Sequence, residues 1–261
     1  VVSNSAGSVT SSAATLTVAA PPPDSGPVTL LDDSFADGSA LNQDLANGSV
    51  QIFKARSGTS RVDAVGSVKF TPSSGDADAH WFHFAAADSP VSLKVGESLS
   101  VSMTFKLDTP KSGGVRFGLF NSEGTQLLTD KTSGHNDAVL QGDRGYVGEF
   151  VIDANASAGP FNRLGRRDTL TTTNLFSAAA DFPNLPGAVA GSTSRLGFVS
   201  DTEYTITMTV RRESETSNAI SVALTGGAFP ENYTYSAIDA GEPGKTTFAF
   251  DWFAFRYGGS G

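Results

Sequence analysis

The densest group of chemically capable side chains lies in one run, Asp78–Phe84, which reads DAHWFHF. Successive side chains of a strand point to opposite faces, so Phe82 shares its face with Phe84, and Trp81 shares the other face with His83. With the phenylalanines in the core, Trp81 and His83 project outwards. An exposed indole offers a flat apolar surface on which a pyranose ring stacks. The alternative is that Trp81 is itself buried.

The same alternation places further polar residues on outward faces. Arg116 falls on the outward face of its strand, and Glu149 lies opposite the ring of Tyr146 in another. A sheet surface that carries Trp81 and His83 with Arg116 and either Tyr146 or Glu149 would form a sugar-binding groove. The sequence leaves open whether these strands are neighbours.

Three arginines, Arg163, Arg166 and Arg167, fall within five residues of a segment that we expect to be a loop. Planar guanidinium groups donate two hydrogen bonds to a carboxylate or sulfate, so Arg163 is a candidate contact for an acidic sugar. The alternative is ordinary ion pairing with a nearby carboxylate such as Asp168. The irregular stretch Thr169–Thr193 could wall a groove.

Retaining glycoside hydrolysis needs two carboxylates about 5–5.5 Å apart. The Glu-x-Asp-x-x-Glu strand of laminarinase-type hydrolases, which would supply them, is absent. Glu149 stands alone, and Glu213 and Glu215 read as part of a polar turn. The sequence therefore gives no residue a catalytic role.

A polysaccharide lyase is a second catalytic alternative, because β-elimination needs a base and a group that neutralises a uronate carboxylate. The sequence holds residues of the required types, and they are His80, His83, His135, Tyr146, Arg116, Arg144, Arg163, Arg166 and Arg167. It lacks the Arg-x-Glu-x-Arg and Gln-Ile-His motifs of alginate-lyase families. A lyase stays an alternative without an assigned site.

Composition excludes several classes of protein. The 261 residues contain no Cys and three His, which excludes a thiolate zinc site, a disulfide framework and a Cys nucleophile. A formal charge of −9 argues against binding to nucleic acid or to an anionic membrane surface. No apolar run approaches the roughly 20 residues of a transmembrane helix.

Apolar and polar residues alternate with period two through most of the chain, as in the runs around Leu99–Leu107 and Tyr204–Val210. Such alternation predicts half-buried antiparallel strands, and many of them predict an all-β, two-sheet sandwich or jelly roll. The Pro-rich stretch 19–27 predicts a linker between a short N-terminal segment, 1–18, and one sandwich domain, 28–257. Residues 258–261 form a Gly/Ser tail.

Two ends of that domain resemble the concanavalin A-like (lectin/glucanase) superfamily. The opening run Leu30–Gly38 resembles its "D-x-F-x-D/G" strand, and Phe250–Tyr257 resembles its closing "V-D-W/Y-V-R-V-Y" strand. Residues 1–18 resemble the last hairpin of a bacterial immunoglobulin-like domain. The residues that carry this second resemblance are Val2, Asn4, Gly7, Ala14, Leu16 and Val18.

The superfamily resemblance implies a structural Ca²⁺. Asp251 resembles the closing-strand residue that helps to hold such an ion, and Asp33 is the candidate partner in the opening strand, beside Asp32 and Asp37. Carboxylate and carbonyl oxygens are the ligands that Ca²⁺ prefers. The alternative is that these residues only cap strands.

These observations favour a non-catalytic carbohydrate-binding module of a secreted or cell-surface bacterial protein with several domains, such as a polysaccharide-degrading enzyme. Val1-Val2-Ser3-Asn4 has no signal-peptide pattern, so we expect a fragment of a longer chain. The expected partners are a polysaccharide and the other domains of the polypeptide, with the module itself monomeric. The alternatives are a lyase or hydrolase with an unfamiliar site and a purely structural or adhesive domain.

Overall fold

A computed structural model gives the fold of most of the chain. It describes residues 2–4, 7–9, 26–32, 35, 38, 43–45, 48–50, 52–54, 60–71, 78–108, 114–128, 137–151, 161–173, 176, 181–190, 198–227, 229 and 232–258. Within these ranges no helix has the length and apolar character needed to cross a bilayer. The described residues include a short 3₁₀ turn, η1 (Ala138–Leu140).

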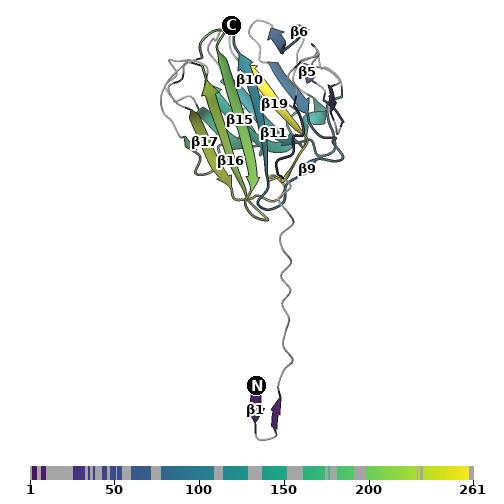
Figure 1. The fold of residues 1–261 in the computed structure, drawn as a ribbon, viewed down its shortest axis with the longest axis vertical. Helices are drawn as coiled ribbons and strands as arrows, with labels where there is room; N and C mark the ends of the chain where they lie inside the picture. Colours follow the sequence, from purple (N-terminus) through teal and green to yellow (C-terminus); the bar gives the residue numbers. More distant parts are fainter. Residues whose placement is uncertain are drawn as a thin grey trace.

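Two antiparallel sheets lie face to face (Figure 1). The five-stranded sheet has the order β10 (Ser98–Lys106), β15 (Glu203–Arg212), β16 (Asn218–Gly226), β17 (Tyr233–Asp239), β14 (Val189–Ala190). The six-stranded sheet has the order β13 (Phe161–Arg166), β12 (Arg144–Val151), β11 (Gly114–Asn121), β19 (Trp252–Gly258), β8 (Asp78–His83), β5 (Ile52–Lys54). The predicted all-β, two-sheet antiparallel sandwich is confirmed.

Four two-stranded pairs complete the described part. They are β18 (Ala249–Phe250) with β9 (Val91–Ser92), β6 (Ser60–Ala64) with β7 (Ser67–Thr71), β3 (Gln43–Leu45) with β4 (Gly48–Val50), and β1 (Val2–Asn4) with β2 (Gly7–Val9). The last pair is a hairpin in which Val2 lies opposite Val9. Ala14, Leu16 and Val18 lie outside the described residues, so the immunoglobulin-like resemblance stays a prediction.

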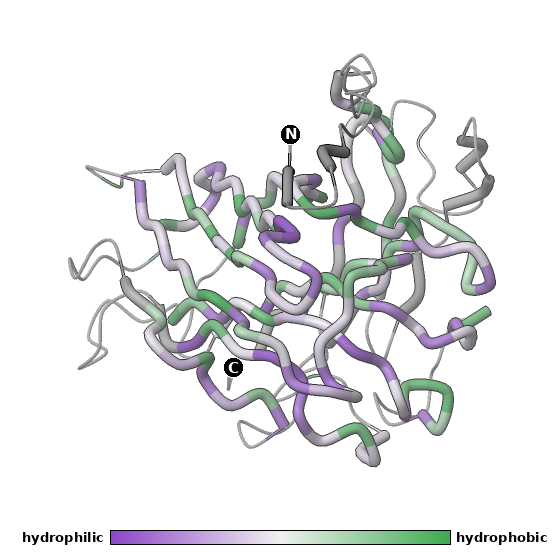
Figure 2. Tube along the Cα trace, turned by 90° about the horizontal axis from the view of Figure 1, so that it is seen from below, coloured by the Kyte–Doolittle hydropathy of each residue, from purple (hydrophilic) through white to green (hydrophobic). Residues whose placement is uncertain are grey.

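The main core fills the space between the two sheets. Phe117 and Leu119 of β11 pack in the same buried cluster as Ile206 and Met208 of β15. Buried and less buried residues alternate along β15, and Figure 2 shows hydrophobic and hydrophilic residues interspersed along the trace. On the solvent side of the five-stranded sheet, hydroxyl groups pair across β10 and β15, as in Ser102 with Thr207 at 2.6 Å. The period-two pattern therefore separates core from solvent in this sheet.

The six-stranded sheet is buried on both faces. Its inner face is the one toward the five-stranded sheet, and its outer face carries a second apolar cluster. The members of that cluster are Trp81, Phe120, Leu127, Leu140, Val147, Phe176, Phe182, Trp252 and Ala254. Two of these rings, Phe176 and Phe182, come from residues 167–190, called here the covering segment, which the structure describes at 167–173, 176 and 181–190. The covering segment thus packs on the middle of the outer face.

Candidate functional site

Trp81 lies on the outer face, as the alternation predicts, but it is 1 % exposed. Its ring stacks on that of Trp252, with ring centroids 6.1 Å apart, while Phe82 stacks on Phe253 in the main core. The expectation that Trp81 is an exposed stacking platform is wrong. The physical reason is the second apolar cluster, which takes this ring into a core of its own.

His83 is also buried beneath this cluster, at 6 % exposed, with its ring edge-on to Trp252 at 5.6 Å. Burial lowers the pKa of its imidazole to about 4, against the opposing effect of a hydrogen bond with Gln126. His83 is therefore neutral at physiological pH. The prediction that it contacts a ligand at the surface is wrong for the same reason as for Trp81.

Tyr146 points the other way, into the sandwich. Its hydroxyl donates to Asp239 Oδ2 at 2.8 Å and accepts a hydrogen bond from Asn218 Nδ2 at 2.7 Å. Burial raises its pKa well above the ordinary value, and the charge of Asp239 adds to this. Tyr146 therefore belongs to a buried polar network that joins the two sheets, and its predicted ligand contact is wrong.

The segment that we expected to be an arginine-rich loop begins as strand β13. Side chains alternate along this strand, so they are divided between the two faces of the sheet. Arg166 points inward, where it donates to Asp239 Oδ1 at 2.7 Å and to Asp168 Oδ1 at 2.9 Å. Arg167 is fully buried and donates to the carbonyl oxygens of Leu140 and Thr172. The alternative of ordinary ion pairing is confirmed for Arg166, and Arg163 lies on the outer face.

Four charged residues stand in register across four adjacent strands of the outer face. Arg256 of β19 lies opposite Arg116 of β11, Arg116 lies opposite Glu149 of β12, and Glu149 lies opposite Arg163 of β13. These four residues are called here the arginine row. It brings together three residues that the sequence predicted as ligand contacts, and it adds Arg256.

Glu149 is the centre of the arginine row. Arg116 Nε donates to its Oε1 at 2.9 Å, and Arg163 Nη2 lies 3.6 Å from its Oε2. Arg116 and Arg256 each donate a further hydrogen bond to the carbonyl oxygen of Phe176 in the covering segment. The guanidinium groups are therefore held in fixed positions by β12 and by the covering segment.

The arginine row combines burial with an unsatisfied acceptor. The side chains of Arg116, Glu149 and Arg163 are 19 %, 8 % and 13 % exposed. Glu149 Oε2 is buried and accepts no hydrogen bond in the structure. A buried acceptor of this kind costs free energy until a donor reaches it, so it favours a ligand with hydroxyl groups. Gly114 leaves room for this carboxylate, because a Cβ there would lie 3.1 Å from Oε1.

The arginine row offers guanidinium donors and one carboxylate acceptor to a ligand. Glu149 is the one carboxylate in this register, and none of the His or Tyr residues in the described ranges lies in it. His80 is buried, Arg144 pairs with Glu123 at 3.6 Å, and His135 lies outside the described residues. Among the described residues, His80 and Tyr146 therefore do not lie in the arginine row with Arg116 and Arg163. Glu213 and Glu215 do lie in a polar turn, paired with Arg211 and Arg212.

Asp251 is buried at the opposite end of the outer face. Its Oδ1 accepts from the Ser122 backbone amide at 2.9 Å, and its Oδ2 accepts from the Ser122 hydroxyl and from Gln126 Nε2. Both carboxylate oxygens are therefore engaged by protein donors. Within the described residues no group of three His, Asp or Glu side chains is arranged to hold a metal ion. Asp33 lies outside the described residues, so the predicted calcium site stays a prediction.

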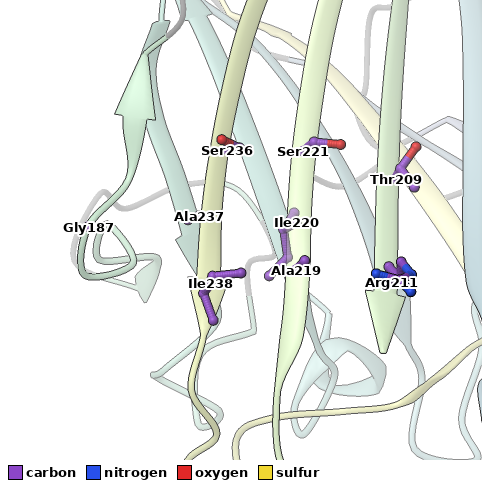
Figure 3. A pocket seen from close by; sticks show the side chains of 9 residues that line it. All are labelled: Gly187, Thr209, Arg211, Ala219, Ile220, Ser221, Ser236, Ala237 and Ile238. Atoms are coloured by element: carbon purple, nitrogen blue, oxygen red, sulfur yellow. The ribbon is translucent and has the colours of Figure 1, made fainter. Parts of the chain in front are cut away.

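A hollow of about 520 Å³ lies on the solvent side of the five-stranded sheet, over β15, β16 and β17 (Figure 3). Thr209, Ser221 and Ser236 form one row across it, and Arg211 and Ile238 border it. None of the nine residues that line it is aromatic, and Arg211 is paired with Glu213. It therefore offers fewer specific contacts than the arginine row.

The sequence reasoning missed Arg256 and the backbone of Phe176. Arg256 could have been found, because Trp252, Ala254 and Arg256 share one face of an alternating strand. The contact of Phe176 with Arg116 joins residues 60 positions apart and has no local signal in the sequence.

No protein-family model matches the chain, and no curated protein matches it. Solved structures with a similar fold include the lectin UEA-II in complex with galactose, at 11 % identity and a TM-score of 0.31, covering 78 % of this chain and 91 % of that one. They also include the winged bean acidic lectin in complex with methyl-alpha-D-galactose, at 11 % identity and a TM-score of 0.26, covering 80 % of this chain and 87 % of that one. The likeness concerns the β-sandwich fold alone.

Proposed function

We propose that this protein is a non-catalytic carbohydrate-binding module and that the arginine row is its binding site. The observation that carries the proposal is the register of Arg256, Arg116, Glu149 and Arg163 across four strands, on the face that the sandwich core does not use. The predicted setting, a secreted or cell-surface bacterial protein with further domains, is part of the proposal.

A sugar suits this site because it presents both hydroxyl donors and oxygen acceptors. The unsatisfied Oε2 of Glu149 accepts a hydroxyl group, and the guanidinium groups donate to ring and hydroxyl oxygens. Because Arg116 is already fixed by Glu149 and by the Phe176 carbonyl, less side-chain entropy is lost when a ligand binds.

The test is retention of the protein on a panel of immobilised polysaccharides, with new reducing ends and the ultraviolet absorbance of unsaturated uronates measured in the same samples. We expect retention without product. Arg116→Gln should weaken retention about tenfold, the effect of losing one charge-assisted contact. Arg211→Gln makes the same charge change on the other sheet and should leave retention unchanged.

New product in these samples would overturn the non-catalytic assignment. Equal weakening by Arg116→Gln and Arg211→Gln would overturn the assignment of the site. Absence of both retention and product over a broad panel would favour a structural or adhesive domain.

A further inference from the structure

Strand β10 forms one edge of the five-stranded sheet. In the described part of the chain it pairs with β15 along all nine of its residues and with no strand on its other side, called here the outer edge. The pairing with β15 keeps one register from end to end. The outer edge therefore carries an uninterrupted row of backbone amide and carbonyl groups, which is a template for a further strand.

The hydrogen bonds of β15 show which backbone groups lie at the outer edge. Arg212 N donates to the Glu97 carbonyl at 3.0 Å, and the Arg212 carbonyl accepts from Gly96 N at 2.7 Å. Because backbone groups alternate in direction along a strand, Val210 also bonds toward β10, and its partner Leu99 bonds toward β15. The even-numbered residues of β10 therefore turn their amides to the outer edge.

This edge lacks the features that usually keep a long edge strand from pairing, which are proline, a central charge, a bulge, a short length or a cover. β10 has no proline, and its charged residue, Lys106, stands at its end and pairs with Glu203 at 3.2 Å. The other described edges of the two large sheets are short or covered. β14 has two residues and β5 has three, and the Leu185 amide of the covering segment donates to the Leu164 carbonyl of β13 at 2.9 Å.

The side chains of β10 divide into an apolar set and a hydroxyl set. The inward side chains pack against the main core but stay half-buried, whereas the inward side chains of β15 are buried. These half-buried residues are Leu99, Val101, Met103 and Phe105. The outward side chains, three serines, one threonine and Lys106, are exposed. A strand added at the outer edge would remove more of the apolar set from water, which favours association.

A second copy of β10 matches the inward side chains. In an antiparallel register centred on Ser102, all nine residues of one strand lie opposite residues of the other. Leu99 then meets Phe105 of the second copy, and Val101 meets Met103. The even-numbered residues lie opposite one another, as the hydrogen bonds of an antiparallel ladder require.

The same register matches the outward side chains. Ser102 meets Ser102 of the second copy, and Ser100 meets Thr104, which repeats the hydroxyl pairs that β10 makes with β15. Lys106 meets Ser98, so no like charges lie opposite each other. Because the pair is two-fold symmetric, one strand supplies both halves of the contact.

We propose that β10 is an interaction surface for a second copy of this chain, bound edge to edge in an antiparallel pair centred on Ser102. The two five-stranded sheets then form one continuous sheet. This dimer replaces the expectation of a monomeric module. The contact uses no residue of the arginine row, so its test is independent of the test of the proposed function.

The experiment is sedimentation equilibrium of the full chain at concentrations from about 1 to 100 μM, which gives its mass in solution. The variants are Ser102→Lys, Ser102→Glu and Ser102→Pro. Ser221→Lys is the matched control, because Ser221 is exposed on the same face but lies on β16, two strands from the outer edge. Thermal melting establishes that each variant is folded.

We expect the unmodified chain and Ser221→Lys to form dimers in this range. Ser102→Lys and Ser102→Glu should each raise the dissociation constant of the dimer about tenfold or more, because like charges then lie opposite each other. An equimolar mixture of these two variants should restore the dimer. Ser102→Pro should also weaken it, since proline removes an amide at the outer edge and no hydrogen bond to β15.

A monomer at every concentration would overturn this inference and leave the carbohydrate-binding function standing. A dimer that is equally weakened by Ser102→Lys and Ser221→Lys would also overturn it, because added charge on the face would then explain the effect. So would a dimer that the Ser102 variants leave intact. Failure of the mixture to restore the dimer would contradict the register centred on Ser102. Should Ser102→Pro melt before the assay temperature, the two charged variants and their mixture decide.

Discussion

Trp81 is a core residue of the outer face, because its indole is 1 % exposed and packs in the second apolar cluster. Alternation placed it correctly on the face opposite Phe82, but that face has its own apolar layer, in which Trp81 meets Trp252. The alternation within one strand assigns each side chain to one of the two faces, but it does not show which other segments pack on each face. The covering rings come from positions about 95 and 100 residues further along the chain, Phe176 and Phe182.

Trp81→Ala should therefore act on stability. Removing a fully buried indole costs about 3–5 kcal/mol through lost burial and the cavity that remains. Denaturant unfolding measures this change, with Leu128→Ala as the control because that leucine is 76 % exposed. An unfolding free energy that is unchanged in Trp81→Ala, together with lost sugar binding, would restore Trp81 as a surface platform.

Asp251 predicts an unusual dependence of stability on pH. Burial raises the pKa of this carboxyl to about 6, against the opposing hydrogen bonds from Ser122. Because the folded-state pKa lies above the unfolded value, its contribution to stability is full below about pH 4 and is lost as pH rises through 6. The loss is on the order of 3 kcal/mol.

Asp251→Asn should remove this contribution. The unfolding free energy of the variant minus that of the unmodified chain should therefore increase from pH 4 to pH 7. Denaturant unfolding of both proteins across this range gives the difference directly. The comparison with the variant is needed because the lowered pKa of His83 acts in the opposite direction. A difference that stays constant with pH would show that Asp251 does not titrate in this range.

At the scale of elements, the contact between β13 and the covering segment depends on the absence of a side chain at Gly165. A Cβ there would lie 2.7 Å from the carbonyl oxygens of Phe182 and Pro183, closer than backbone atoms tolerate. Leu185 also donates its backbone amide to the Leu164 carbonyl at 2.9 Å. The covering segment is thus attached to the edge of the sheet next to the arginine row.

Gly165→Ala should push this segment away and lower the unfolding free energy by about 1–3 kcal/mol. It should also weaken sugar binding, because the Phe176 carbonyl that holds Arg116 and Arg256 belongs to the same segment. Gly148→Ala is the matched comparison, since the atoms nearest to its Cβ would be those of the Val222 side chain, at 3.0 Å and beyond, rather than backbone atoms. Thermal melting and retention assays of both variants measure the two effects. An equal loss of binding in the two variants would contradict this role of the covering segment.

For the whole molecule, the sequence predicted the two-sheet sandwich because period-two alternation within a single segment is enough to indicate a strand with one face in a core. It also placed Arg116 on the outward face of its strand and offered Glu149 as an alternative to Tyr146 for the same surface. It could not predict that β11, β12 and β13 are adjacent, because strand order depends on contacts between distant segments. The burial of His83 was missed for the same reason, whereas the burial of Trp81 was one of the two alternatives that the alternation left open.

The central claim is that a carbohydrate binds along the arginine row. The most direct measurement is a ¹H–¹⁵N spectrum of the arginine side chains, recorded during titration with the polysaccharide that the retention assays select and assigned with single Arg→Lys variants. We predict that the Nε–Hε signals of Arg116, Arg163 and Arg256 shift together with increasing ligand and that the signal of Arg211 does not. Binding accompanied by a shift of Arg211 alone, or by no shift in the three signals of the row, would contradict the claim.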